Sequence, residues 1–371
     1  MIREERIIKE FSELVSIDSP SYKEREMADA LKEKLKAIGF TVKEDEAGAK
    51  IGGNAGNIYA YMEGELNAEP ILFCCHIDTV EPSRGKQAVV REDGTITSSG
   101  ETVLGSDDLS GVVEILEAIR HLKEEGIPHR PFEVVLMVAE EVFGKGAKAY
   151  DYEGWPFRSK EAYVLDMSGP VGSATVAGPS IVGWEARIKG LSAHAGFNPE
   201  KGVNAISAAS RAIALLTPGW VDEETTMAVG TIKGGKANNI VPDQCIVTGE
   251  ARSLNHTRAL EVVEGVAMTF MEQAGQAEVD FVVEPHIIAY ETPEDHPVIK
   301  RFKRACDKLG LPGQMKRPLG GSDNNILVRH GLAGTVLSTG MTNVHSCQEY
   351  IPVEDLQKGA KLLAELLTDE E

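Results

Sequence analysis

The sequence lacks any apolar run long enough to span a membrane, and its amino end has no signal-peptide core. Cysteine is scarce and odd in number. The five residues include the neighbours Cys74 and Cys75, which argues against a disulfide framework and favours a reducing, cytoplasmic compartment. Positive charge is also in deficit, because 38 lysines and arginines stand against 58 aspartates and glutamates, a net charge of −20. This balance argues against nucleic acid and anionic membranes as partners.

Several widespread site signatures are missing as well. The chain has no His-Glu-x-x-His zinc motif, no paired Cys-x-x-Cys, no P-loop and no Gly-x-Ser-x-Gly nucleophile elbow. The glycine-rich segments Gly144-Lys-Gly and Lys233-Gly-Gly-Lys lack the spacing of nucleotide-binding loops. Any site is therefore expected to be assembled from residues scattered along the chain.

A chain of 371 residues exceeds the usual size of a single core, so two domains are expected. Up to residue 178, short apolar runs alternate with helical patterns, which is typical of a doubly wound, mixed sheet in an α/β domain. Residues 179–287 follow a β-α-β-β-α-β order, which predicts a small two-layer α+β domain with an antiparallel sheet. The α/β pattern then returns. We therefore predict a discontinuous catalytic domain of residues 1–178 and 288–371, with residues 179–287 inserted.

Local signals mark the second helix of the chain. A capping box, Ser21-x-x-Glu24, predicts its start, and Gly39 is placed to end it. Between them, apolar residues recur at helical spacing and share one face, which predicts that this helix packs against the core.

A set of acidic and imidazole side chains, all but His345, lies next to or at the ends of the apolar runs of the first domain. Ligands in open α/β sheets bind beyond the carboxyl ends of the strands, so these side chains are expected to converge. Carboxylates brought together there repel one another unless a cation compensates their charge. A pair of divalent metal ions would do so. The set comprises His76, Asp78, Asp107, Asp108, Glu140, Glu141, Asp166 and His345.

Each short motif also has a purely structural interpretation. Residues two apart on a strand point the same way, so Asp78 could accept the second ring N–H of His76 and orient it as a metal ligand, or form a buried pair without metal. Asp107 could bridge two cations or cap the helix that follows. In the pair Glu140-Glu141, one glutamate could bind metal while the other takes a proton from water, or both could lie in a solvated loop.

Taken together, the motifs resemble those of the co-catalytic zinc exopeptidases, which include peptidase T, glutamate carboxypeptidase, succinyl-diaminopimelate desuccinylase and the aminoacylases. The resemblance covers essentially the whole chain. It is closest to the peptidase T-like branch, through His76-Ile-Asp-Thr-Val, Leu104-Gly-Ser-Asp-Asp and Asn343-Val-His345. It implies two divalent metal ions, with zinc expected first and cobalt or manganese as alternatives.

The resemblance also implies a role for each matching residue. His76 and Asp166 would hold one metal, and Glu141 and His345 the other. Asp107 would bridge the two metals beside a non-proline cis peptide bond to Asp108, while Asp78 would orient His76 and Glu140 would act as general base and later as acid. The inserted domain would serve as lid and dimerisation domain. Its His194 would polarise the scissile carbonyl, often from the partner subunit, and the expected substrate-holding residues are Asn239, Arg252, Gly320, Gly321 and Ser322.

The implied activity is hydrolysis of a short peptide near its amino end, as by a tripeptide aminopeptidase, with a homodimer as the working form. Water between the two metals would lose a proton to Glu140 and attack the carbonyl. A carboxypeptidase or N-acyl-amino-acid amidohydrolase on the same scaffold is one alternative, and a non-catalytic binding protein is another. Ureido-hydrolysing relatives tend to have histidine in place of Asp166, which disfavours them. Leu109 and Phe143 depart from the family pattern and bear on substrate preference.

Overall fold

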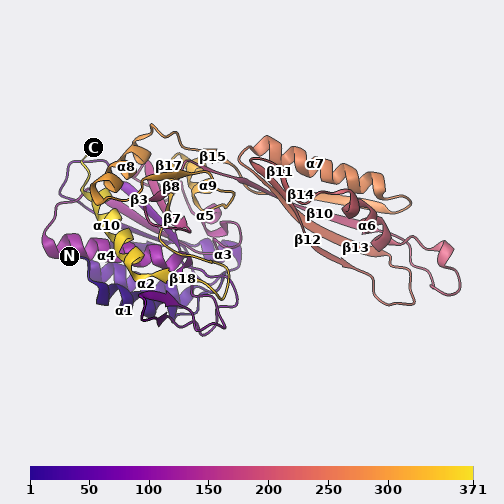
Figure 1. The fold of residues 1–371 in the computed structure, drawn as a ribbon, viewed down its shortest axis with the longest axis horizontal. Helices are drawn as coiled ribbons and strands as arrows, with labels where there is room; N and C mark the ends of the chain where they lie inside the picture. The colour runs from indigo at the N-terminus through magenta and orange to yellow at the C-terminus, as the bar shows by residue number, and fades with distance from the viewer. Residues whose placement is uncertain (371) are drawn as a thin grey trace. The chain divides into compact units, whose positions relative to one another are not determined.

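The apolar runs of the sequence form the centre of an eight-stranded mixed sheet in the computed structural model, which describes residues 1–370 (Figure 1). The four central strands run parallel, and antiparallel pairs join the flanking strands to them. In spatial order, the strands are β1 (Thr41–Glu44), β2 (Ile58–Met62), β6 (Phe132–Met137), β3 (Ile71–His76), β7 (Glu161–Met167), β17 (Ala333–Ser338), β8 (Ser173–Thr175) and β16 (Gln314–Lys316).

Helices cover both faces of this sheet. The longest, α4, packs so closely that a Cβ atom on Gly111 would lie 2.6 Å from Leu165 Cβ and 2.9 Å from Cys75 Sγ. Cys74 and Val164 alternate to the opposite face and are buried as well. In Figure 1, α1, α2, α4 and α10 group together, while α5 and α9 lie across the strands from them. The predicted doubly wound α/β domain is thus confirmed.

The helices of this part of the chain are α1 (Glu4–Val15), α2 (Arg25–Ile38), α3 (Ala47–Ile51), α4 (Ser106–Glu125), α5 (Lys145–Ala149), α8 (Pro297–Leu309), α9 (Asn324–Leu327), η2 (Val328–His330) and α10 (Val353–Thr368). A small sheet completes it, made of β4 (Val89–Val90), β5 (Thr95–Thr97) and β18 (Tyr350–Pro352). The paired strands β9 (Ala177–Gly178) and β15 (Tyr290–Glu291) lie where the chain passes from one unit to the other. Within residues 1–370, no helix has the length and apolar character that crossing a membrane requires.

The second helix does not begin as its capping box predicts. Helix α2 has Glu24 at its N-cap position without a side-chain cap. Instead, Ser21 Oγ donates to Asp78 Oδ2 at 2.7 Å, and Glu24 Oε1 accepts main-chain N–H groups of Tyr22 and Ala139 at 2.7 and 3.1 Å. These contacts take up both side chains of the motif, so its prediction is wrong at this end. The predicted end of the helix is confirmed at Gly39, whose φ is +111°.

A second compact unit comprises Gly178–Tyr290 and the short segment Pro318–Gly321. The segment lies outside the range expected for the inserted domain. It joins this unit through local contacts, because Arg252 Nη1 donates to the carbonyl of Leu319 at 3.1 Å and Gly321 lies close against Ile287. The remaining described residues form the first unit, namely Met1–Ala177, Glu291–Arg317 and those from Ser322 onward.

The second unit has two layers, as predicted, with helices packed on one face of an antiparallel sheet through their own hydrophobic core. It contains one strand more than the predicted order, because β11 lies between α6 and β12. All four residues of β11 are exposed, so the strand has no buried face. It therefore lacks the alternation of apolar and polar residues by which a half-buried strand is predicted from sequence. Its elements are β10 (Ser180–Lys189), η1 (Pro199–Lys201), α6 (Ala205–Leu215), β11 (Gly219–Asp222), β12 (Thr225–Gly234), β13 (Gln244–Ser253), α7 (His256–Gln273) and β14 (Glu278–Ile287).

The contact between α10 and α4 predicts an unusual response to alanine. A Cβ atom on Gly359 would lie 2.1 Å from Cδ of Glu114, a side chain with only 1% of its residue surface exposed. Overpacking by Gly359→Ala should cost about 1–3 kcal/mol. Alanine normally brings a gain of about 1 kcal/mol to a helix interior, so the free energy of unfolding should fall by up to about 2 kcal/mol. Denaturant titration of both proteins measures the difference.

Gly265 in α7 provides the matched control. It is exposed, and a Cβ atom there would meet no atom within 4 Å. Gly265→Ala should stabilise the protein by about 0.5–1 kcal/mol. Equal stabilisation by both substitutions would contradict the close packing of α10 on α4.

Candidate active site

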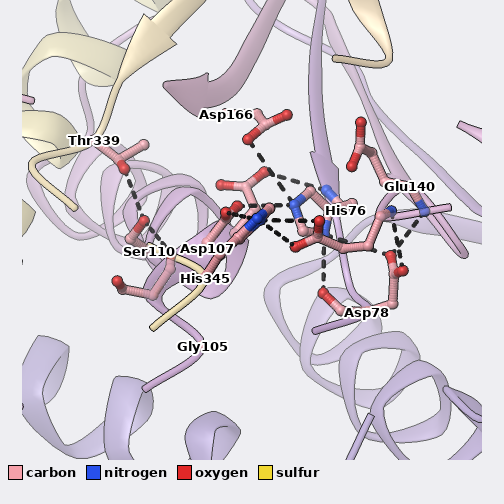
Figure 2. A network of polar contacts seen from close by, with 12 residues as sticks. His76, Asp78, Gly105, Asp107, Ser110, Glu140, Asp166, Thr339 and His345 are labelled. Atoms are coloured by element: carbon pink, nitrogen blue, oxygen red, sulfur yellow. Dashed lines mark hydrogen bonds and ion pairs between the residues drawn. The ribbon is translucent and has the colours of Figure 1, made fainter. Parts of the chain in front are cut away.

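Five segments of the first unit bring their ends together at one place (Figure 2). His76 is the last residue of β3, and Asp166 lies near the carboxyl end of the parallel strand β7. Glu141 follows β6, Asp107 lies in the first turn of α4, and His345 lies in the loop before β18. Parallel pairing of β3, β6 and β7 places their carboxyl ends at one edge of the sheet, which is the edge at which α/β proteins bind ligands.

The carboxylate of Asp107 lies at the centre of this group. Its Oδ1 is 3.0 Å from Nε2 of His76, and its Oδ2 is 3.2 Å from Nε2 of His345. Glu141 Oε2 lies 3.0 Å from the same nitrogen of His345, and Asp166 Oδ1 lies 4.0 Å from Nε2 of His76. Each oxygen of Asp107 therefore faces a different imidazole ring (Figure 2).

Asp107 does not cap helix α4. Gly105 occupies the N-cap position, and Asp107 has φ −84° and ψ 102°, which are not helical angles. The peptide bond from Asp107 to Asp108 is cis, as the family resemblance implies. Asp108 Oδ2 in turn accepts the main-chain N–H of His76 at 3.2 Å. Asp107 is therefore not the cap of α4, and its role as a metal bridge stays a prediction.

The converging side chains form two groups that could each hold a metal ion. His76, Asp107 and Asp166 offer one ligand atom each within 4.8 Å of one another, and so do Asp107, Glu141 and His345. Carboxylate oxygens and imidazole nitrogens are the ligands that zinc and related divalent ions accept. The three carboxylates of the set outnumber its two imidazoles, and His76 and Asp107 are buried, so two cations would compensate the negative charge. The residues fit the predicted pair of metals.

The pKa values reflect the same excess of negative charge. Burial raises the pKa of Asp107, but hydrogen bonds from His345 and His76 outweigh that effect and hold it below its usual range. Hydrogen bonds with Asp107 and then Glu141 raise the pKa of His345 to about 10. Burial, with the charge of Asp107 added, raises the pKa of Asp166 well above its usual value. A cation at this position would favour the charged form of every carboxylate.

Asp78 contacts more groups than the sequence predicted. His76 Nδ1 lies 2.9 Å from the main-chain oxygen of Asp78 and 3.5 Å from its Oδ1, so the ring N–H donates chiefly to the carbonyl. The carboxylate accepts the main-chain N–H groups of Glu140 and Glu141 at 2.9 and 3.3 Å, and the hydroxyl of Ser21. The predicted contact of the second ring nitrogen of His76 with Asp78 is therefore present, with the main-chain oxygen as the nearer acceptor. The carboxylate also accepts from the glutamate pair, and the role of Asp78 in orienting His76 stays a prediction.

Glu140 is the remaining candidate of the first unit. Burial raises the pKa of its carboxyl group well above the usual value. The charge of His76 opposes this shift, whereas the charges of Asp323 and Glu141 add to it. A carboxylate whose pKa is raised can take a proton from water and hold it near neutral pH.

Most residues expected to hold substrate belong to the second unit. His194 is exposed, its Nδ1 accepts the N–H of Gly196 at 3.1 Å, and its ring lies 4.3 Å from that of Phe197. Asn239 is exposed, and its main-chain oxygen accepts the N–H of Ala195 at 3.0 Å. The two residues are therefore held close to each other through the backbone, and their contact with a substrate stays a prediction.

The other expected substrate residues divide between the units. Arg252 donates to the carbonyl of Leu319, directly before Gly320 and Gly321 in the same unit. Ser322 belongs to the first unit and is buried. Sequence reasoning missed Ser21 as a partner of Asp78, because the local capping motif offered a competing explanation.

Comparisons with known proteins agree with this geometry. The family model described as Peptidase family M28 matches residues 57–198. The model of the Peptidase dimerisation domain of M20 enzymes matches residues 177–278. A dinuclear metal-binding peptidase of the M20 family from Bacillus subtilis shares the fold, with 18% identity, a TM-score of 0.69, and coverage of 98% of this chain and 97% of that one.

Two solved structures are similar to the chain in sequence as well. A tripeptidase from Staphylococcus aureus is 34% identical with a TM-score of 0.94, over 99% of this chain and 98% of its own. The aminopeptidase PepT from Bacillus cereus is 37% identical with a TM-score of 0.89, over the same shares of the two chains. Such identity along the full length goes well beyond a shared fold. The chain belongs to the peptidase T-like M20 peptidases and is a metal-dependent peptidase.

Proposed function

We propose that the protein is a two-metal aminopeptidase that removes the amino-terminal residue from tripeptides. The observation that carries the proposal is the position of Asp107, which presents one carboxylate oxygen to each of two imidazole rings. A carboxylate shared in this way suits a pair of divalent ions, because paired metals in hydrolases lie about 3.5–4 Å apart. Zinc is the first candidate for both positions, since the ligands are nitrogen and oxygen atoms.

The choice of substrate draws on the relatives. Two structures that share more than 30% identity with the chain along its full length are a tripeptidase and an aminopeptidase. The same site geometry would also serve a carboxypeptidase or an N-acyl-amino-acid amidohydrolase. We favour the tripeptide because sequence similarity to those two enzymes includes both units of the chain.

His76 and Asp166 would hold one metal, Glu141 and His345 the other, and Asp107 both; once bound, the two ions would acidify water and polarise the scissile carbonyl. The main-chain N–H of Glu140 donates to the carboxylate of Asp78. The side chain of Glu140 takes a proton from the attacking water. It then gives that proton to the leaving amine.

In this proposal, His194 donates a hydrogen bond to the oxyanion that forms at the scissile carbonyl. Arg252 pairs with the peptide's carboxylate, because a planar guanidinium group suits that anion.

We also propose a homodimer and a reducing compartment. The match to a Peptidase dimerisation domain over residues 177–278 supports association through the second unit. All five cysteines are unpaired, four of them buried, which is usual for proteins of the cytoplasm.

Replacing the proposed base should separate chemistry from metal binding. Glu140→Gln should lower kcat by about 10²–10⁴-fold, because general base catalysis typically contributes that much. Metal content, measured by elemental analysis, should stay at the wild-type value because Glu140 is not in either ligand group. Glu153→Gln, at an exposed position, serves as the control and should leave kcat unchanged. A Glu140→Gln enzyme with wild-type turnover would contradict the assignment.

A panel of peptides tests the substrate directly. The metal-loaded enzyme should release the first residue of tripeptides, and acetylation of the amino terminus should lower kcat/KM by about 100-fold or more if that group is bound. Mass spectrometry of early products identifies the bond that is cut. First release of the carboxyl-terminal residue would instead indicate a carboxypeptidase, and turnover of N-acyl amino acids an amidohydrolase. Binding of these compounds without turnover, with zinc, cobalt or manganese added, would favour a non-catalytic binding protein.

A further inference from the structure

A buried carboxylate outside the two ligand groups holds the segment that carries Asp107. Glu349 has 1% of its residue surface exposed, and both of its oxygens accept hydrogen bonds. Oε2 accepts the main-chain N–H groups of Leu104 and Gly105 at 2.7 and 2.9 Å. Oε1 accepts the hydroxyl of Ser106 at 2.6 Å and the main-chain N–H of Asp107 at 3.0 Å. All four donors belong to consecutive residues, so one side chain fixes the course of this loop.

The same glutamate belongs to the loop that supplies His345. The main-chain N–H of Glu349 donates to the carbonyl of Ser346 at 3.1 Å, directly after the histidine. His345 itself has φ +60°, a left-handed conformation that a residue with a side chain keeps only where its surroundings hold it. Glu349 therefore connects two segments that lie more than 200 positions apart in sequence, and each segment contributes a side chain to the group of Asp107, Glu141 and His345.

The chemistry of the contact requires a carboxylate. A carboxylate offers only acceptor atoms, and here it meets four donors. Glutamine has the same size, but its amide NH₂ would face two of those donors. A change from glutamate to glutamine at this position therefore replaces two attractive contacts with two donor–donor contacts.

We propose that Glu349 is a positioning residue of the metal centre, which sets the placement of the Asp107 carboxylate relative to His345. Glu349 acts through the main-chain N–H of Asp107 and through its own loop, and not through the carboxylate of Asp107 or the ring of His345. This inference rests on the proposed two-metal function. Groups that orient metal ligands commonly change metal affinity or activity by about 10–100-fold when they are replaced.

The test compares Glu349→Gln with the wild-type protein in metal binding and in kinetics. Competition with a chromophoric chelator gives the dissociation constants for Zn²⁺. We expect binding of one of the two ions to weaken by about 10–100-fold. At saturating Zn²⁺, kcat for a tripeptide should fall while KM changes by less than about twofold, because Glu349 does not lie in the proposed substrate-binding set. Glu354→Gln on α10, whose side chain is 74% exposed, is the matched control and should behave as wild type.

A second substitution covers the case in which Glu349→Gln does not fold. Ser106→Ala removes one of the four donors and leaves the carboxylate in place. It should weaken Zn²⁺ binding in the same direction by about two- to tenfold. The Tm of each metal-free protein measures how far the substitution destabilises the fold itself. A loss of Zn²⁺ affinity can then be compared with that loss of stability.

The results distinguish this inference from the proposed function. Wild-type Zn²⁺ affinity and kcat in both variants, with only a lower Tm, would overturn the positioning role and leave the two-metal function standing. A wild-type protein that binds none of Zn²⁺, Co²⁺ and Mn²⁺ would overturn the proposed function itself. Weakened Zn²⁺ binding in Glu349→Gln, and to a lesser degree in Ser106→Ala, would support the positioning role.

Discussion

The sharing of one carboxylate between two imidazole rings is the interaction on which the site depends. Asp107 reaches both His76 and His345, although these residues come from a strand and from a distant loop. The arrangement is possible because α4 starts irregularly, with Asp107 outside helical angles. Its carboxylate thereby faces the ligands, while the rest of the helix packs on the sheet.

The repulsion between neighbouring carboxylates accounts for the hydrogen bonds that surround the site. Burial alone would drive several of these carboxyl groups toward their neutral forms, as the raised pKa values of Asp166 and Glu140 show. Asp78 is stabilised differently, because main-chain N–H groups and Ser21 donate to its carboxylate. Hydrogen bonds thus support the carboxylates at the periphery, and the centre is left for cations.

Much of the fold could be predicted because its signals are local. Apolar runs predicted the strands of the first domain, and a glycine signal predicted the end of α2 at Gly39. The ligand candidates other than His345 followed from the position of acidic and imidazole residues at the ends of those runs. The sequence pattern was also sufficient to indicate the family, which the relatives confirm.

The parts that could not be predicted depend on contacts between distant residues. Ser21 bonds Asp78 across 57 positions, and nothing in the local sequence distinguishes this contact from a helix cap. Strand β11 has four exposed residues and hence no alternating pattern. The segment Pro318–Gly321 joins the second unit through a main-chain carbonyl, an atom that every residue possesses.

The most direct test of the account is anomalous diffraction from crystals of the zinc-loaded protein, recorded at the zinc absorption edge. The account predicts two peaks about 3.5–4 Å apart, one beside His76 and Asp166 and the other beside Glu141 and His345, with the Asp107 carboxylate between them. A single peak, or peaks out of bonding reach of Asp107, would contradict it.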